Sequence, residues 1–135
     1  MSPTLVRRLV ALAAVALLAG ALALVLGGVR NADGGELEPV GRWYEARVGP
    51  YGAGLYGRPT ACGRELTPST RGIAHPVLPC GAKIFLSYGG RDVPTEVVDR
   101  GPHTAGRDFE LTEALAAELG LSGVQVLRWR FAGER

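Results

Sequence analysis

Residues 83–102 read KIFLSYGGRDVPTEVVDRGP, and this segment says most about the architecture. Lys83–Tyr88 and Arg91–Val98 are predicted to be strands, because they are rich in β-branched and aromatic residues. The pair Gly89-Gly90 between them accepts the positive φ that a two-residue hairpin turn requires. Pro94 lies inside the second strand and predicts a sheet edge or a bulge there. The segment therefore predicts an antiparallel hairpin that ends in an Asp-Arg-Gly-Pro turn.

Three further elements are predicted on either side of this hairpin. Arg42–Val48 is predicted to be the first strand. Thr112–Leu119 is predicted to be a helix, because Thr112 suits the N-cap and Gly120 suits the left-handed position after the last turn. Val124–Phe131 is predicted to be the last strand, since apolar residues alternate in it with arginines. Short strands and one helix together predict a mainly β fold, a small barrel with an inserted helix.

The N-terminal segment is uniformly apolar. Leu9 to Val29 contains 21 residues, all of them Ala, Val, Leu or Gly. A helix of that length spans about 30 Å, the thickness of the hydrocarbon core of a bilayer. Arg7 and Arg8 precede it, which favours a cytoplasmic N-terminus and an exported remainder. We interpret residues 1–30 as a signal anchor in the membrane or, alternatively, as a cleaved signal peptide.

The remainder of the chain divides into a spacer and one domain. Residues 31–40 are polar, acidic and rich in Gly, so they are predicted to be a linker, and residues 41–135 are the folded domain. The protein is then expected at the cell membrane, held by its single N-terminal helix, or outside the cell if that helix is cleaved. The domain is expected to be monomeric.

The charge of the exported part argues against nucleic-acid binding. The whole chain carries 15 basic and 13 acidic residues, but three of the arginines precede Asp33, the first acid. Residues 31–135 therefore carry 12 basic against 13 acidic groups. A nucleic-acid-binding surface needs Lys and Arg clustered on a folded face. No nucleic-acid partner is expected.

The two cysteines agree with export. Cys62 and Cys80 are the only ones in the chain, and an even number of cysteines in an oxidising compartment usually forms disulfides. The competing interpretations are a catalytic thiol or a metal site. His75 and His103 are too distant in sequence from the cysteines to give zinc-ligand spacing. We therefore expect a disulfide, no metal and no cofactor.

Four segments carry a family resemblance. They read YGRPTACG, GIAHPVLPCG, VDRGP and FELT, and they cover residues 56–63, 72–81, 98–102 and 109–112. In this order and spacing they resemble the rare lipoprotein A-like (RlpA-like) double-psi β-barrel domain over roughly residues 41–131. The resemblance implies a six-stranded double-psi barrel. That barrel is shared with expansins, which loosen cell walls without demonstrable hydrolysis.

The resemblance to the lytic branch of this family is incomplete. Its members cleave the glycan strands of peptidoglycan, and they carry one acid just after the turn that here ends at Gly63 and another three residues later. This chain has Arg64 and Thr67 at those positions, and Glu65 is one residue out of register. The turn also carries Cys62 in place of Asn, which is consistent with a disulfide variant of the domain.

Asp99 is the first candidate for a catalytic residue. Glycosidic cleavage without water needs an acid that protonates the leaving oxygen, and the same group can then take the proton of the attacking sugar hydroxyl. Partial burial and the adjacent Arg100 can tune the protonation of a carboxyl group at this place. The alternative is that Asp99 only caps the turn by accepting hydrogen bonds from its amides.

The resemblance suggests two further catalytic candidates. Glu110 stands just before the predicted helix, where similar domains carry an acid, and it is expected to share a groove with Asp99; interaction with the helix dipole is the alternative. His75 precedes a proline and is expected to be extended. It would orient Asp99 or contact a sugar, although a lone histidine is more often structural. His103 is expected to be a solvated loop residue.

The remaining candidates concern substrate binding. Tyr56, Thr60 and Arg100 are assigned to the glycan-binding groove. Tyr51 and Trp43 can also stack on sugar faces, but core packing is the expectation for Trp43.

The sequence thus predicts an exported domain that binds peptidoglycan or a related cell-wall glycan, in an expansin-like or weakly lytic manner. The first alternative is a peptidoglycan lytic transglycosylase with Asp99 as general acid and base, supported by His75 and Glu110. The acids missing at Arg64 and Thr67 favour binding over cleavage. The second alternative is a protein-interaction module of the cell envelope, because small barrels serve many unrelated functions.

Overall fold

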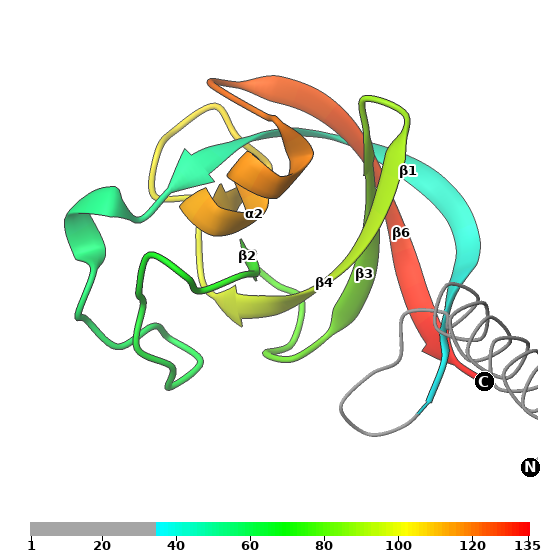
Figure 1. The fold of residues 1–135 in the computed structure, drawn as a ribbon, viewed down its shortest axis with the longest axis horizontal. Helices are drawn as coiled ribbons and strands as arrows, with labels where there is room; N and C mark the ends of the chain where they lie inside the picture. Colours follow the sequence, from blue (N-terminus) through cyan, green and yellow to red (C-terminus); the bar gives the residue numbers. More distant parts are fainter. Residues whose placement is uncertain (1–34) are drawn as a thin grey trace, which may run out of the picture. The chain divides into compact units, whose positions relative to one another are not determined.

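The computed structural model describes residues 35–135, and Figure 1 shows how their strands close into a barrel. The strands follow one another around the barrel in the order β1-β5-β2-β4-β3-β6. In chain order the elements are β1 (Leu37–Tyr51), the 3-10 helix η1 (Ala53–Leu55), β2 (Ile73–Ala74), β3 (Lys83–Tyr88), β4 (Arg91–Asp99), β5 (Phe109–Thr112), α2 (Glu113–Leu119) and β6 (Gln125–Glu134). The prediction of a mainly β, six-stranded fold with one short α-helix is confirmed.

The central hairpin forms as predicted. Strands β3 and β4 pair antiparallel from Lys83↔Glu96 to Tyr88↔Arg91. The two glycines of the turn have φ of 59° and 77°, the left-handed region that the turn requires. Pro94 pairs with β3 on one side, while the pairing of β4 with β2 begins only at Val97. The proline therefore stands where β4 has one neighbouring strand, because it has no N–H for a second.

Strand β1 is longer than predicted at both ends. It begins at Leu37, and residues 37–40 pair antiparallel with residues 131–134 of β6. Residues 37–40, assigned above to the linker, are therefore part of the barrel. Beyond Val48 the strand continues to Tyr51 by pairing in parallel with β5. These extensions arise from partner strands distant in sequence, so local composition gave no sign of them.

Helix α2 has the caps that the sequence predicted. The Oγ1 of Thr112 accepts a hydrogen bond from the N–H of Leu115 at 3.4 Å, and Gly120 has φ of 66°. Leu115, Ala116 and Leu119 are buried on its inner side and join the hydrophobic core of the barrel. This packing fixes the short helix, which is too short to be stable alone.

The barrel core is apolar, and two of the strands end on the same side of the barrel. Its fully buried large side chains include Ile84, Leu86, Phe109, Leu111 and Leu127. Strands β1 and β4 end on the same side of the barrel, where the segment between β1 and β2 loops outward (Figure 1). The candidate site lies where these strand ends and this loop meet.

The predicted membrane segment, Leu9–Val29, lies outside the described residues. Within residues 35–135 no helix is long and apolar enough to cross a membrane.

Candidate functional site

A small pocket lies between the β1–β2 loop and the turn that follows β4. Its volume is about 130 Å³. The lining residues are Leu55, Arg58, Pro59, Thr60, Leu66, Asp99 and His103. Among these described residues Asp99 is the one carboxylate. The pocket brings together Thr60 and Asp99, both predicted, with His103, which was expected to be solvated.

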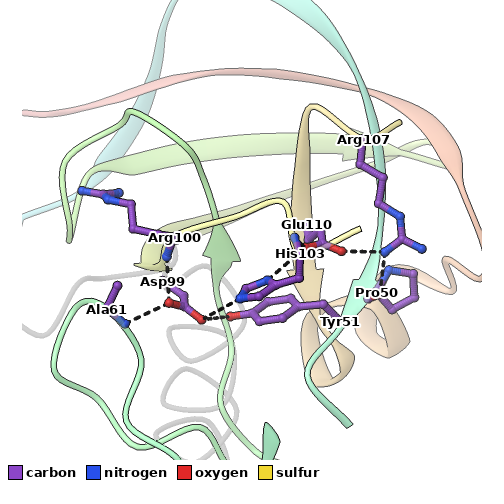
Figure 2. A network of polar contacts seen from close by, with 8 residues as sticks. All are labelled: Pro50, Tyr51, Ala61, Asp99, Arg100, His103, Arg107 and Glu110. Carbon is purple, nitrogen blue, oxygen red and sulfur yellow. Dashed lines mark hydrogen bonds and ion pairs between the residues drawn. The ribbon is translucent and has the colours of Figure 1, made fainter. Parts of the chain in front are cut away.

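Asp99 lies at the end of β4 with its carboxylate held by three donors (Figure 2). Its Oδ1 accepts hydrogen bonds from the amides of Ala61, at 2.9 Å, and Arg100, at 2.7 Å. Its Oδ2 accepts from the hydroxyl of Tyr51 at 3.1 Å. The carboxylate therefore caps its own turn, which was the alternative to a catalytic role in the sequence analysis. It also joins the β1–β2 loop to the barrel and remains at the pocket surface, with the residue 7% exposed.

Tyr51 supports Asp99 from the end of β1. Its ring is buried and stacks on the imidazole of His103, with centroids 4.8 Å apart and planes 8° from parallel. Burial, followed by the charge of Asp99, raises the pKa of Tyr51 well above its usual value, so its hydroxyl remains a donor. Tyr51 is therefore covered by His103, and its ring face does not meet the pocket. The sequence signal for this role was only its place before a Gly-rich loop.

His103 links the two candidate carboxylates. Its Nε2 lies 4.0 Å from Oδ2 of Asp99, and its Nδ1 lies 3.1 Å from Oε1 of Glu110 (Figure 2). Its side chain is 40% exposed, so one edge of the ring faces solvent. His103 is exposed and lies in the loop between β4 and β5, as expected, but the fold of this loop also places its ring beside both carboxylates. Its spacing of four residues from Asp99 was the available signal.

Glu110 does not face the groove. Its side chain is fully buried, and Oε2 accepts a hydrogen bond from Nη1 of Arg107 at 2.7 Å. The same Nη1 donates to the carbonyl of Pro50 at 2.9 Å, and the amide of His103 donates to Oε1 of Glu110. The expected groove shared by Asp99 and Glu110 is therefore corrected: Glu110 lies behind His103, paired with an arginine three residues earlier that folds back over it.

His75 and Arg100 serve the neighbouring loop. The Nδ1 of His75 accepts hydrogen bonds from the amides of Val77 and Leu78, at 3.2 and 3.0 Å. Nη1 of Arg100 donates to the carbonyls of Leu78 and His75. Only the backbone of His75 meets Asp99, through a hydrogen bond from the His75 amide to the Asp99 carbonyl. Neither side chain lines the pocket, so the structure does not bring these two candidates to it.

The buried imidazole predicts a pH dependence of stability. Burial, followed by the charge of Arg100, lowers the pKa of His75. The pKa of histidine in an unfolded chain is about 6.5. Below that pH the unfolded chain therefore binds a proton on His75 more readily than the folded chain does. The free energy of unfolding should then fall as the pH is lowered from 7.5 to 5.5, measured by urea denaturation. In His75→Asn, whose amide oxygen can accept from the same two amides, the fall should be smaller. Equal slopes in both proteins would contradict this role.

The disulfide fastens the loop that supplies part of the pocket lining. Cys62 and Cys80 are bonded, as predicted. Cys62 follows Ala61, whose amide holds Asp99, and Thr60 is buried on the pocket wall. The bond thus fastens the β1–β2 loop to the segment before β3.

Removal of this disulfide should destabilise the domain. It closes a loop with a sequence separation of 18, which corresponds to about 3 kcal/mol in the chain-entropy description. Thermal unfolding of the double variant Cys62→Ser, Cys80→Ser should show a clearly lower Tm than the oxidised protein. The reduced wild-type chain should match the double variant, and an unchanged Tm on reduction would remove the bond from the account of stability.

The positions that depart from the lytic pattern lie outside the pocket. Arg64 forms an exposed ion pair with Glu96, with Nη1 and Oε1 3.0 Å apart. Thr67 hydrogen-bonds to Ser69 and Thr70 within its own turn.

Tyr56 is 38% exposed and does not line the pocket. Trp43 is half-buried on β1, where the guanidinium groups of arginines on β6 lie over its ring.

Comparison with known proteins finds both a family and relatives. The family model described as lytic transglycolase, a double-psi β-barrel, matches residues 43–131. The "Probable endolytic peptidoglycan transglycosylase RlpA" of Nostoc sp. is 38% identical over 86 residues, which are 61% of this chain and 23% of that protein. The "Endolytic peptidoglycan transglycosylase RlpA" of Yersinia pestis is 36% identical over 74 residues, 53% of this chain and 21% of the relative. The chain thus spans less than a quarter of the length of these relatives.

A solved structure also shares the fold. The "Streptomyces papain inhibitor (SPI)" superposes with a TM-score of 0.53 at 25% sequence identity. The match covers 69% of this chain and 96% of the inhibitor.

Proposed function

Because the chain belongs to the lytic transglycolase family of double-psi β-barrel domains, we propose that it acts on the glycan strands of bacterial peptidoglycan as a lytic transglycosylase. The observation that carries this proposal is the position of Asp99. Its carboxylate is the one acid among the described residues that line the pocket. The relatives named endolytic peptidoglycan transglycosylases support the choice of substrate.

A pocket with one carboxylate suits a lytic reaction better than hydrolysis. Glycoside hydrolases ordinarily use two carboxyl groups, one on each side of the scissile bond. Here the second candidate, Glu110, is fully buried and paired with Arg107. A lytic reaction needs no activated water, since a hydroxyl of the sugar itself attacks the anomeric carbon. Proton transfer at one place in the pocket then suffices.

The proton transfers in this reaction balance within the site. The bond between the anomeric carbon and the leaving oxygen breaks while that oxygen receives a proton. A new bond forms between the anomeric carbon and the attacking hydroxyl oxygen, which gives up its own proton. Asp99 lies where it can exchange these protons, and its three hydrogen bonds hold it in place.

Product analysis tests the proposal. The full chain, purified in mild detergent, is incubated with peptidoglycan sacculi, and the soluble fraction is examined by mass spectrometry for anhydro-muropeptides. Their release is the expected result. If the chain sediments with sacculi but releases no such product, cleavage is contradicted.

A specific observation favours a second candidate, glycan binding without cleavage. The two positions where the lytic branch is expected to carry acids are Arg64 and Thr67, and both side chains engage partners outside the pocket. A domain of this kind would hold a glycan strand in the manner of an expansin. Sedimentation with sacculi in the absence of product identifies this function.

Export and membrane anchoring belong to the same proposal. They rest on the apolar stretch Leu9–Val29 and the arginines before it. Such an anchor would keep the barrel near the cell wall. N-terminal sequencing of the mature protein from cells tests this: a start well after residue 20 would contradict a retained anchor.

A further inference from the structure

His103 is held as a proton-transfer group would be, although the sequence gave it no function. Glu110 fixes one of its ring nitrogens at 3.1 Å, and Tyr51 stacks on the ring plane. The other ring nitrogen faces the pocket and Asp99. An imidazole oriented by a buried carboxylate, with its free nitrogen toward the reacting group, is the arrangement by which enzymes position a histidine for proton transfer.

The direction of the hydrogen bonds defines which ring nitrogen of His103 carries a hydrogen. Arg107 donates to Glu110 at 2.7 Å, and an ionised carboxylate only accepts hydrogen bonds. The contact between Nδ1 of His103 and Glu110 therefore needs a hydrogen on Nδ1. In the neutral ring Nε2 is then the acceptor, and in the imidazolium Nε2 carries a second hydrogen toward the pocket.

Asp99 is surrounded by hydrogen-bond donors, whereas His103 is surrounded by carboxylates. Asp99 accepts hydrogen bonds from three donors, which occupy both of its oxygens as acceptors. His103 lies between the carboxylates of two acids, Asp99 and Glu110. The distance of 4.0 Å between Nε2 of His103 and Oδ2 of Asp99 exceeds a hydrogen bond. At this separation a substrate atom bound between Nε2 of His103 and Oδ2 of Asp99 can lie within hydrogen-bond distance of both.

We propose that the two proton transfers are divided between these residues, with His103 as the acid and Asp99 as the base. This inference rests on the proposed function. Nε2 of the His103 imidazolium gives its proton to the leaving oxygen as the glycosidic bond breaks. Asp99 takes the proton of the attacking sugar hydroxyl as the new bond forms. After the product leaves, the proton passes from Asp99 to Nε2 of His103, and the site returns to its starting state.

The position of the ring proton is the first test, and it needs no substrate. The chain contains only two histidines, so ¹⁵N NMR of the imidazole nitrogens is simple, and His103→Gln assigns the signals. Neutral His103 should carry its hydrogen on Nδ1. His75 should carry its hydrogen on Nε2, because its Nδ1 accepts from two amides. Two histidines with opposite tautomers support the orientation by Glu110, and a hydrogen on Nε2 of neutral His103 overturns it.

The rate of product release is the second test. His103→Gln should lower the release of anhydro-muropeptides by about 100-fold, the usual contribution of a general acid, while sedimentation with sacculi is retained. The side chain is partly exposed, so the variant should fold. Thr104→Ala, in the same exposed loop, is the matched control and should match the wild type.

The pH profile separates an acid from a structural residue. The charged or titratable groups around His103 are Tyr51, Arg58, Asp99, Arg107 and Glu110. In the wild type, kcat/KM should fall at high pH as His103 loses its proton. His103→Gln should lack this basic limb.

The outcomes distinguish the two proposals. A wild-type chain that releases no product overturns the proposed function and the acid role together, while the NMR result still decides the orientation of the ring. A wild-type chain that releases product, together with a His103→Gln variant of equal rate and unchanged pH profile, overturns the role of His103 alone.

Discussion

Asp99→Asn should abolish the release of anhydro-muropeptides, with a loss of about 10³-fold or more, within the range of general acid–base catalysis. The substitution removes the ability to exchange protons but keeps the shape of the side chain. The amide oxygen of Asn can still accept from the amides of Ala61 and Arg100, and its amino group can donate to the hydroxyl of Tyr51. The turn and the β1–β2 loop should therefore stay in place. Mass spectrometry of the soluble fraction measures the loss.

A matched control makes this result specific. Asp92→Asn changes an exposed acid on the same strand, outside the pocket, and should release product at the wild-type rate. Both variants should sediment with sacculi and unfold at similar temperatures. Product release by Asp99→Asn at the wild-type rate would exclude Asp99 from the chemistry. A lower Tm together with lost binding would assign the effect to the fold instead.

Glu110→Ala should lower the free energy of unfolding by about 3–5 kcal/mol, the usual cost of breaking a buried ion pair. Glu110 is fully buried, and Arg107 is only 14% exposed, so truncation leaves the guanidinium with little water to replace its partner. The amide and ring of His103 lose their acceptor as well. Urea denaturation measures the change.

The control for this loss is an exposed ion pair of the same barrel. Glu96 and Arg64 are 3.0 Å apart, with side chains 35% and 57% exposed. Glu96→Ala should therefore cost less than about 1 kcal/mol. Similar losses in the two variants would mean that burial does not govern the strength of the Glu110 pair.

The elements that the sequence predicted well are those whose signals are local. The β3–β4 hairpin follows from Gly89-Gly90, and helix α2 follows from Thr112 and Gly120. The sequence analysis did not predict the ends of β1 and β6, and it did not predict the two-residue strand β2. Pairing with distant strands defines them, and β2 is too short to show a pattern of its own.

The candidate site, too, has features with local sequence signals and features that depend on distant contacts. The amino-acid sequence was enough to predict that a β-barrel forms, that Cys62 and Cys80 pair, and that Asp99 ends a strand at a turn. The partners of that carboxylate outside its own turn are seen only in the folded domain: Tyr51 from β1, Ala61 from the disulfide-bound loop, and His103. It also moved Glu110 from the expected groove into the interior. Tyr51 and Ala61 are 48 and 38 residues from Asp99 in the chain, so the folding of the barrel and its loop is needed to bring them together. His103 is only four residues away, and the path of the β4–β5 loop places its ring beside Asp99.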